Sequence, residues 1–366
     1  MKIWELKLLS APTFLALHEV SIMVQSAWGS RETQFFYSLT PEKVLDAVEH
    51  SLGVRCTGRS MAHASMENRV YEIELERDEN DVSPARSLEH LVIAKFYRPG
   101  RWTKEQILEE HSYLKALDAE EIPVVAPKAF KDGATLHQLE DSGIYYAIFP
   151  KVAGRSPQEI TLSEIEQIGR LLGRMHNVGA QIKAQHRIRL TPEVYLKENF
   201  AYLIRENLLP ERLRGPFSEL VERLAKVAAL RFKGIDNILI HGDCHMGNLL
   251  QFGTHYSWVD FDDSLIGPAV QDLWLLLPGR DLYAQRMMDH LIDGYEQMRP
   301  FPRETLNLIE LLRSFRMIHF AAWIGNRRDD PAFINAFPQY GSDGYWQELY
   351  NDLIDQEEWV LKDTWG

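Results

Sequence analysis

The apolar positions of the chain follow helical spacing over long stretches, and several of these stretches begin with recognisable capping residues. Thr40-Pro41-Glu42 has the residue types of a helix start, and Gly53 follows the last apolar position of that stretch. Thr103-Lys104-Glu105-Gln106 and Thr161-Leu162-Ser163-Glu164 each have a Thr followed three residues later by Gln or Glu. That spacing lets two side chains satisfy backbone N–H groups at a helix start. The pattern therefore predicts three helices with defined beginnings.

Short apolar runs in the N-terminal part of the chain predict strands at residues 70–75, 91–97 and 144–149. Beyond residue 160 the apolar spacing is mainly helical, near residues 192–208, 217–231, 269–279, 281–297, 304–325 and 344–362. We therefore expect an α+β protein with a small β-rich N-lobe and a larger, mainly helical C-lobe.

The segment Pro150-Lys151-Val152-Ala153-Gly154 follows the third strand and is the best linker in the chain. It predicts an N-lobe of residues 34–150 and a C-lobe of residues 151–366. Residues 1–33 precede the first motif and contain an apolar run, Leu8–Leu17, closely flanked by acidic residues. A secretory signal has a longer apolar stretch and a small-residue cleavage site. We expect an extension outside the fold, either a tail or a packed appendage.

The charge balance narrows the range of partners. Forty basic and 53 acidic residues give a net charge of −13, which argues against a nucleic-acid partner and against a membrane surface. Cys56 and Cys244 are the two cysteines, so no disulfide framework is implied and a reducing, cytoplasmic setting fits. The length suffices for two lobes, and a monomer is expected.

Two carboxylates and one amide follow short apolar runs in the middle of the chain: Asp243, Asn248 and Asp260. Phosphoryl transfer needs a group that accepts or orients the hydroxyl proton, and oxygen ligands that hold Mg²⁺ on the nucleotide phosphates. The five-residue offset from Asp243 to Asn248 equals that between the base and the metal ligand of the protein-kinase catalytic loop. We expect Asp243 and Asp260 to be catalytic, with Asn248 and Asp260 as metal ligands.

Lys95 lies in the middle of the second apolar run, as in the kinase strand whose lysine contacts the α- and β-phosphates. Glu110 lies on the apolar face of the helix that begins at Thr103, and a carboxylate there needs a partner. Lys95 is the expected partner of this carboxylate. Glu109 points about 100° away and is the weaker candidate. The alternative for Lys95 is an edge-strand lysine that points to water. The alternative for Glu110 is a solvated glutamate at the edge of the apolar face.

Two other stretches have the composition of nucleotide contacts. Ser65 and Asn68 lie in a turn that enters the first strand, where small polar side chains and backbone N–H groups suit phosphate. An ordinary hairpin turn is equally compatible with these residues. At the linker, the C=O of Pro150 and the N–H of Val152 can read adenine, because proline lacks only a donor.

Three further predictions concern residues near the loop that carries Asp243. Asp272 is expected to accept backbone N–H groups of that loop, in a structural role. A zinc site at His241 and His245 lacks a helix and a third soft ligand. Cys244 has no evident base with its own orienting partner, which argues against a cysteine nucleophile.

The central motifs resemble those of a known superfamily. His241-Gly242-Asp243-x-His245-x-x-Asn248, followed by Val259-Asp260-Phe261-Asp262-Asp263, resembles the aminoglycoside phosphotransferase and choline kinase superfamily. Additional stretches resemble the bacterial stress response kinase A family, and the resemblance covers roughly residues 34–360. These stretches are Glu67-Asn68-Arg69-Val70-Tyr71, Lys95-Phe96-Tyr97-Arg98-Pro99, Arg101-Trp102, Ile107-Leu108-Glu109-Glu110-His111 and Gln271-Asp272-Leu273-Trp274.

The resemblance implies a protein-kinase-like, two-lobed fold and the use of ATP with Mg²⁺. It implies that Asp243 is the proton acceptor, that Asn248 and Asp260 hold the metal, and that Ser65 contacts ATP. The family is described as phosphorylating serine and threonine residues of proteins, itself included, in stress responses.

Three functions remain open from the sequence. The leading one is an ATP- and Mg²⁺-dependent kinase of protein hydroxyls. The second is a small-molecule kinase acting on an amino alcohol, a sugar or an aminoglycoside. The third, a nucleotide-binding pseudokinase scaffold, is disfavoured because Lys95, Glu110, Asp243, Asn248 and Asp260 are all present.

Overall fold

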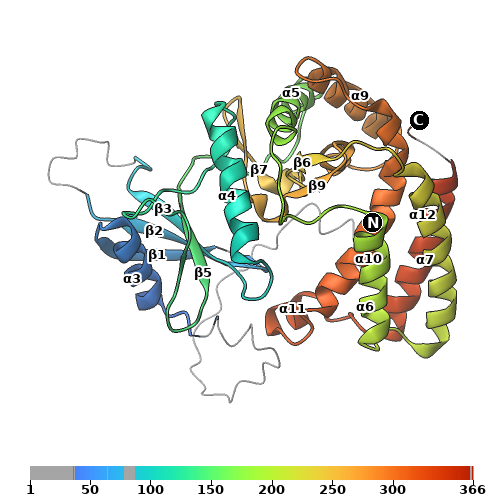
Figure 1. The fold of residues 1–366 in the computed structure, drawn as a ribbon, viewed down its shortest axis with the longest axis horizontal. Coiled ribbons are helices and arrows are strands. Elements are labelled where there is room, and N and C mark those ends of the chain that lie inside the picture. The colour runs from blue at the N-terminus through green and yellow to red at the C-terminus, as the bar shows by residue number, and fades with distance from the viewer. Residues whose placement is uncertain (1–35, 37, 64, 78–86, 363–364, 366) are drawn as a thin grey trace. The chain divides into compact units, whose positions relative to one another are not determined.

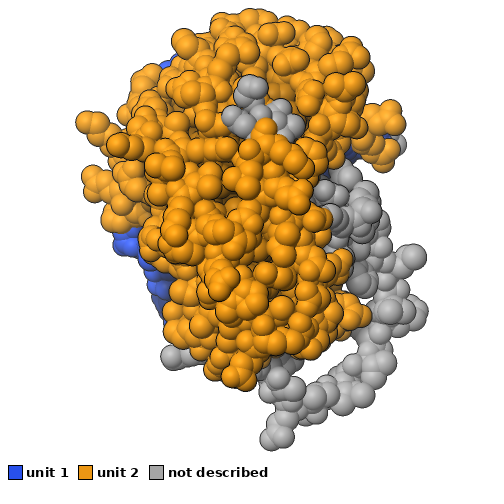
Figure 2. All heavy atoms as spheres, turned by 90° about the vertical axis from the view of Figure 1, so that its right-hand side faces the viewer, with its two compact units in different colours: residues 1, 3–157, 247–262 blue, residues 2, 158–246, 263–366 orange. Residues whose placement is uncertain are grey.

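The computed structural model describes residues 36, 38–63, 65–77, 87–362 and 365, so the extension expected at residues 1–33 lies outside the described residues. The described chain forms two compact units (Figures 1 and 2). Unit 1 contains the residues up to 157 together with 247–262, and unit 2 contains residues 158–246 and 263–366. The chain therefore leaves unit 2 after Met246 and returns to it at Asp263. The lobe boundaries expected at residues 33 and 150 stay predictions.

Unit 1 is built around a five-stranded sheet in which all neighbouring strands are antiparallel. The spatial order is β1-β2-β3-β5-β4. The strands expected near residues 70, 91 and 144 are confirmed, whereas β1 carries mostly exposed side chains and gave no apolar signal. The bounds are β1 (Cys56–His63), β2 (Arg69–Leu75), β3 (Leu91–Phe96), β4 (His137–Gln138) and β5 (Tyr145–Pro150).

The two faces of β3 have different neighbours, because successive side chains of a strand point to opposite faces. Ala94 and Phe96 belong to a buried apolar cluster with Val44 and Val48 of helix α3 (Pro41–Leu52). The alternating position Lys95 lies at a pocket instead. Helix α3 begins at the Thr40 cap and ends at Gly53, where φ is +68°, as the sequence predicts.

Helix α4 (Lys104–Ala119) begins with the expected capping box, formed by Thr103 and Gln106. Its buried face includes Glu110 and His111. The hairpin of β7 (Leu249–Phe252) and β8 (His255–Trp258) also belongs to unit 1. It is attached through Gln251, which exchanges backbone hydrogen bonds of 2.8 and 3.2 Å with Arg155.

Unit 2 is mainly helical, with one small pair of antiparallel strands, β6 (Ile238–Ile240) and β9 (Leu265–Gly267). The α+β class and the helical C-terminal part are thus confirmed. The helices are α5 (Leu162–Gly179), α6 (Asn199–Arg205), α7 (Glu211–Arg231), α8 (Val270–Trp274), α9 (Leu282–Glu296), α10 (Ile309–Gly325), α11 (Pro331–Ala336) and α12 (Asp343–Lys362), with a π-helical turn η1 (Glu193–Glu198) before α6.

Two helix bounds, those of α7 and α8, differ clearly from the expected ones, and one further helix was not expected. Helix α7 begins at Glu211, about six residues before the start expected from the apolar spacing, and contains Pro216. Helix α8 ends at Trp274, five residues before the expected end. The short helix α11, capped by Asp330, had not been expected. Within the described part of the chain, no helix combines the length and the apolar character that crossing a bilayer requires.

Glycines allow α5 and α9 to pack unusually closely within unit 2. A Cβ on Gly169 of α5 would lie 2.1 Å from the backbone oxygen of Leu291, and one on Gly294 of α9 would lie 1.9 Å from that of Glu166. Neither backbone oxygen can move aside cheaply, so larger side chains would push the helices apart. This packing brings His176 of α5 and Tyr295 of α9 within 2.9 Å, where they hydrogen-bond.

Candidate active site

A pocket of about 410 Å³ in unit 1 collects most of the residues singled out in the sequence. Its volume is within the range of small-molecule sites. The lining includes eight of them: Ser65, Asn68, Lys95, Glu110, Pro150, Val152, Asn248 and Asp260. Asp243 belongs to unit 2.

The pocket has an apolar part next to the expected linker. Ile93, Phe149 and Leu250 line it, together with Val70, Leu114, Val125, Val259 and Phe261. Apolar walls with a few polar groups are typical of small-ligand sites. Pro150 and Val152 of the expected linker line the same pocket as these apolar side chains, which we call the apolar slot.

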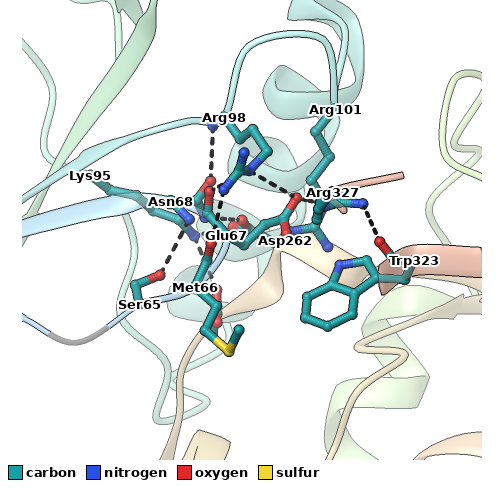
Figure 3. A network of polar contacts seen from close by, with 11 residues as sticks. Ser65, Met66, Glu67, Asn68, Lys95, Arg98, Arg101, Asp262, Trp323 and Arg327 are labelled. Carbon is teal, nitrogen blue, oxygen red and sulfur yellow. Dashed lines mark hydrogen bonds and ion pairs between the residues drawn. The ribbon is translucent and has the colours of Figure 1, made fainter. Parts of the chain in front are cut away.

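The polar part of the pocket is organised by Lys95, which forms ion pairs with two carboxylates. Its ammonium contacts Asp262, and it lies 3.1 Å from Oδ1 of Asp260. The Asn68 amide donates a 2.6 Å hydrogen bond to Asp262 (Figure 3). Lys95, Asn68 and Asp262 come from three separate stretches of the chain and form one buried network, which we call the Lys95 network.

The charges of this network are mutually stabilising. Burial alone would lower the pKa of Lys95, but the carboxylates of Asp262, Asp260 and Glu110 outweigh it, so the pKa is raised. Burial would raise the pKa of Asp262, but Lys95, Arg101 and Asn68 lower it to about 2. Both groups are therefore charged at neutral pH.

Glu110 lies where the helical phase predicts it. Its side chain is almost completely buried, and it lines the pocket with Lys95. Glu109 is partly exposed and is absent from the lining of this pocket. The carboxylate of Glu110 acts on Lys95 after those of Asp262 and Asp260, so Lys95 has three acidic neighbours rather than one.

The turn at residues 65–68 is held by its own hydroxyl and by one arginine. Ser65 Oγ accepts the backbone N–H of Asn68 at 3.2 Å. The Arg98 guanidinium donates to the backbone oxygens of Met66 and Glu67, each at 3.0 Å, and its backbone N–H donates to the Asn68 side chain (Figure 3). Arg98 of the Lys-Phe-Tyr-Arg-Pro stretch thus fixes the turn that presents Ser65 and Asn68.

Asn248 and Asp260 offer oxygen atoms of the type that Mg²⁺ prefers. Both line the pocket, and the backbone oxygen of Asn248 accepts the N–H of Val259 at 3.0 Å, which connects their two segments. Asp260 has a positive φ of +61° and a half-exposed side chain. A non-glycine residue in that conformation is uncommon and marks a functional site more often than chance allows. The donor set fits the expected metal.

In unit 2, Asp243 pairs with a residue that the sequence reading missed. Oδ1 of Asp243 lies 3.0 Å from Nη1 of Arg316 on α10, and Oδ2 lies 3.4 Å from Nε2 of His245. Burial would raise the pKa of Asp243, but Arg316, His245 and His241 lower it well below its ordinary value. The side chain is 22% exposed, so this ionised carboxylate is partly accessible to solvent.

Asp272 of α8 stabilises the loop that carries Asp243 through hydrogen bonds to its backbone. Its carboxylate accepts the backbone N–H groups of His241 and Gly242 at 2.9 and 2.7 Å, and it lies 3.1 Å from Nε2 of His176. The structural role expected for Asp272 is confirmed. Gly242 has a φ of +84°, and a Cβ there would lie 2.3 Å from the backbone oxygen of Asp263. Only glycine allows this turn.

Cys244 lies buried in the same loop, with Asp272 as a neighbour. Burial and the neighbouring Asp272 and Asp243 raise the pKa of its thiol well above the ordinary value. A thiol that stays protonated is a poor nucleophile.

Two residues with strong interactions at these sites were not predicted: Asp262 and Arg316. Asp262 follows Asp260 by two residues, so the acidic cluster was visible, but nothing local distinguishes a buried partner of Lys95 from a solvated acid. Arg316 lies 73 residues after Asp243 and looks like any polar position of an amphipathic helix.

The sequence matches a known family model over most of this region. Residues 64–301 match the phosphotransferase enzyme family. Stress response kinase A of Escherichia coli (strain K12) is 36% identical over 323 residues, which is 88% of this chain and 93% of that protein. The protein called serine/threonine protein kinase RdoA in Salmonella typhimurium (strain LT2) is 34% identical over 322 residues, with the same coverage.

Solved structures with this fold have lower sequence identity. Amicoumacin kinase hAmiN in complex with AMP-PNP, Ca²⁺ and Ami has a TM-score of 0.68 at 18% identity and covers 87% of this chain and 96% of its own. A microcompartment-associated aminopropanol kinase has a TM-score of 0.61 at 17% identity, covering 88% and 98%. The family match and the identity to the bacterial relatives together show that this chain is a kinase that belongs to the phosphotransferase enzyme family, in the group of the stress response kinase A proteins.

Proposed function

We propose that this kinase transfers the terminal phosphoryl group of Mg²⁺-bound ATP to serine or threonine hydroxyls of proteins, its own chain included. The main support is the unit 1 pocket, which Lys95, Asn248 and Asp260 line together with the linker residues Pro150 and Val152 and the apolar slot. The relative named as a serine/threonine protein kinase supports the choice of acceptor.

In this proposal each pocket residue has a defined part. The apolar slot takes the adenine, and the C=O of Pro150 and the N–H of Val152 bind its edge. Lys95 binds the α- and β-phosphates and is kept charged by Glu110 and the two aspartates. The turn of Ser65 and Asn68 covers the phosphates with backbone N–H groups. Asn248 and Asp260 hold Mg²⁺, which neutralises charge on the transferring phosphoryl group.

Asp243 acts on the acceptor. Its carboxylate accepts a hydrogen bond from the serine or threonine hydroxyl and aims that oxygen at the terminal phosphorus. The bond from phosphorus to the bridging oxygen of ADP breaks as the bond to the hydroxyl oxygen forms, and the hydroxyl proton passes to Asp243. A carboxylate with a depressed pKa is a weak base. This suits a loose transition state, in which positioning contributes more than proton abstraction.

The proposal assigns residues 34–150 to nucleotide binding, completed by Val152, Asn248 and Asp260. It assigns the rest of residues 151–366 to catalysis and acceptor binding, in a monomer that acts in the cytoplasm during stress. A second candidate is phosphorylation of a small-molecule hydroxyl, because two solved structures with this fold are an amicoumacin kinase and an aminopropanol kinase.

Labelled ATP separates the two candidates. Wild-type protein and the Asp243→Asn variant are added with Mg²⁺ and labelled ATP to an extract of a strain that lacks this protein, and products are divided into protein and small-molecule fractions. We expect label in serine and threonine of the protein fraction with wild type, and at least about 100-fold less with the variant. Label confined to small molecules would favour the second candidate.

A further inference from the structure

Arg316 occupies an unusual place for a cation, because it lies directly on the carboxylate proposed to orient the acceptor. The guanidinium comes from the middle of α10 and contacts Asp243 at 3.0 Å. Arg316 is 32% exposed and Asp243 is 22% exposed, so neither side chain is sealed in the core. Among the described residues, Asp243 is the hydrogen-bond partner of Arg316, which uses one of its five N–H donors there.

Charged groups of both signs surround this pair. Burial raises the pKa of the Tyr195 phenol of η1, and Asp243 and Arg316 both act on that phenol. So do the carboxylate of Asp263 and the guanidinium group of Arg187. Guanidinium groups therefore lie among the carboxylates around Asp243.

Tyr195 also lines a cavity of about 480 Å³ in unit 2, formed by η1, α6 and α10. Its lining contains one acid, Glu198, and one base, Arg205. The other lining residues are Ile188, Val194, Asn199, Ala201, Tyr202, His319 and Asn326. A site that binds polyamines or aminoglycosides needs an excess of carboxylates, because a desolvated ammonium group must be compensated. This cavity does not have that excess.

We infer that Arg316 is a specificity-determining residue for the phosphate acceptor: it compensates the charge of Asp243, so that the enzyme selects hydroxyls with uncharged or acidic neighbours and rejects hydroxyls with cationic neighbours. The inference rests on the proposed function, because it takes Asp243 as the group that meets the hydroxyl. It narrows that function to serine and threonine in neutral or acidic sequence, and it excludes amino alcohols and aminoglycosides.

A purely structural ion pair would behave differently. If Arg316 only fixed the loop, removing it would lower the rate for all acceptors by the same factor. If it sets specificity, removing it takes away a guanidinium 3.0 Å from Asp243, which then attracts cationic acceptors more strongly, so the ratio between acceptors changes. A charge change a few ångströms from the acceptor is worth about tenfold or more in this ratio.

The test uses three serine peptides that are identical except for lysine, alanine or glutamate before the serine. For the full-length enzyme, kcat/KM with the alanine and glutamate peptides should exceed that with the lysine peptide by at least about tenfold. Arg316→Gln should reduce this ratio about tenfold, and Arg316→Lys, which keeps the charge, should largely restore it. Arg223→Gln is the matched control, since Arg223 forms an exposed ion pair with Glu357 elsewhere in unit 2.

Calorimetric titration with kanamycin, in the presence of Mg²⁺ and AMP-PNP, gives an answer that does not depend on transfer. Arg316→Gln should bind kanamycin at least about tenfold more tightly than wild type or Arg223→Gln. The inference is overturned if Arg316→Gln leaves both the peptide ratio and the kanamycin affinity unchanged, or if wild type prefers the lysine peptide. If no peptide is phosphorylated but kanamycin binding changes as expected, the protein-kinase proposal fails while the role of Arg316 stands.

Discussion

Asp262 in unit 1 and Asp243 in unit 2 are both held ionised by a basic side chain, but their exposure differs. The side chain of Asp262 is 3% exposed, and it is enclosed by Lys95 and Asn68. That of Asp243 is 22% exposed, and its partners include Arg316 and His245. Burial would raise the pKa of each carboxyl, and in both cases the basic neighbours outweigh it.

Under the proposed function, this difference lets one residue type serve two purposes. A buried, fully paired carboxylate can position a lysine but cannot meet a substrate. A partly exposed carboxylate can orient a hydroxyl. Where a guanidinium compensates its charge, it attracts cationic groups less strongly. Exposure, rather than the direction of the pKa shift, separates the two cases, since perturbed carboxylates occur in structural networks as well as in active sites.

The largest effect is expected when the enclosed carboxylate is removed. Asp262→Asn leaves the buried ammonium of Lys95 without one of its two ion-pair partners, and the free energy of unfolding should fall by about 3 kcal/mol. Urea unfolding measures this. Asp141→Asn is the control, because Asp141 also pairs with a lysine, Lys43, but on the surface. The control should lose less than about 1 kcal/mol. Equal losses would mean that the Lys95 network contributes no more than a surface pair.

A smaller effect is expected from the third acidic neighbour of Lys95. Glu110→Gln should lower kcat/KM about tenfold, because it removes a buried charge that keeps Lys95 oriented at the pocket. Glu109→Gln changes the same residue type one position earlier, on a partly exposed part of α4, and should cost less than about twofold. A greater loss at Glu109 than at Glu110 would show that the assigned partner is wrong.

The smallest expected effect in unit 1 concerns His111 and the pH dependence of the unfolding free energy. His111 is buried on α4 and hydrogen-bonds to Tyr97 and Thr135, and burial, reinforced by Lys95, lowers its pKa to about 3. Between the ordinary value of about 6.5 and pH 3, the unfolded chain binds a proton that the folded chain does not. This histidine therefore makes stability fall as the pH falls through that range.

In His111→Gln the slope of unfolding free energy against pH should lose up to about 1.4 kcal/mol per pH unit below pH 6. Wild type and variant are compared by urea unfolding at pH 7, 6 and 5. An unchanged slope would mean that His111 is protonated in the folded protein.

Those parts of both units whose signals are local could be predicted from sequence. The capping boxes at Thr103 and Thr161 and the buried position of Glu110 follow from spacing within one helix. Asp272 was anticipated because a carboxylate near a loop is a natural acceptor for its N–H groups, and its contacts with His241 and Gly242 bear this out.

The partners of the two aspartates could not be predicted in the same way. Lys95 and Asp262 are 167 residues apart, and Arg316 is 73 residues from Asp243. No short-range pattern encodes such pairs, because each depends on how the elements pack. The same reason explains why Lys95 was assigned Glu110 as its partner, whereas the structure adds Asp260 and Asp262.

The central claim is that the pocket of unit 1 binds the nucleotide while Asp243 acts on the acceptor. Calorimetric titration of Mg²⁺ and AMP-PNP into Asp260→Asn and Asp243→Asn, combined with transfer rates for the second variant, tests it directly. We expect Asp260→Asn to weaken nucleotide binding at least about tenfold, because it removes a metal ligand. Asp243→Asn should bind within about twofold of wild type and transfer at least about 100-fold more slowly. Equal loss of nucleotide affinity in both variants, or a transfer rate for Asp243→Asn above about a tenth of wild type, would contradict the account.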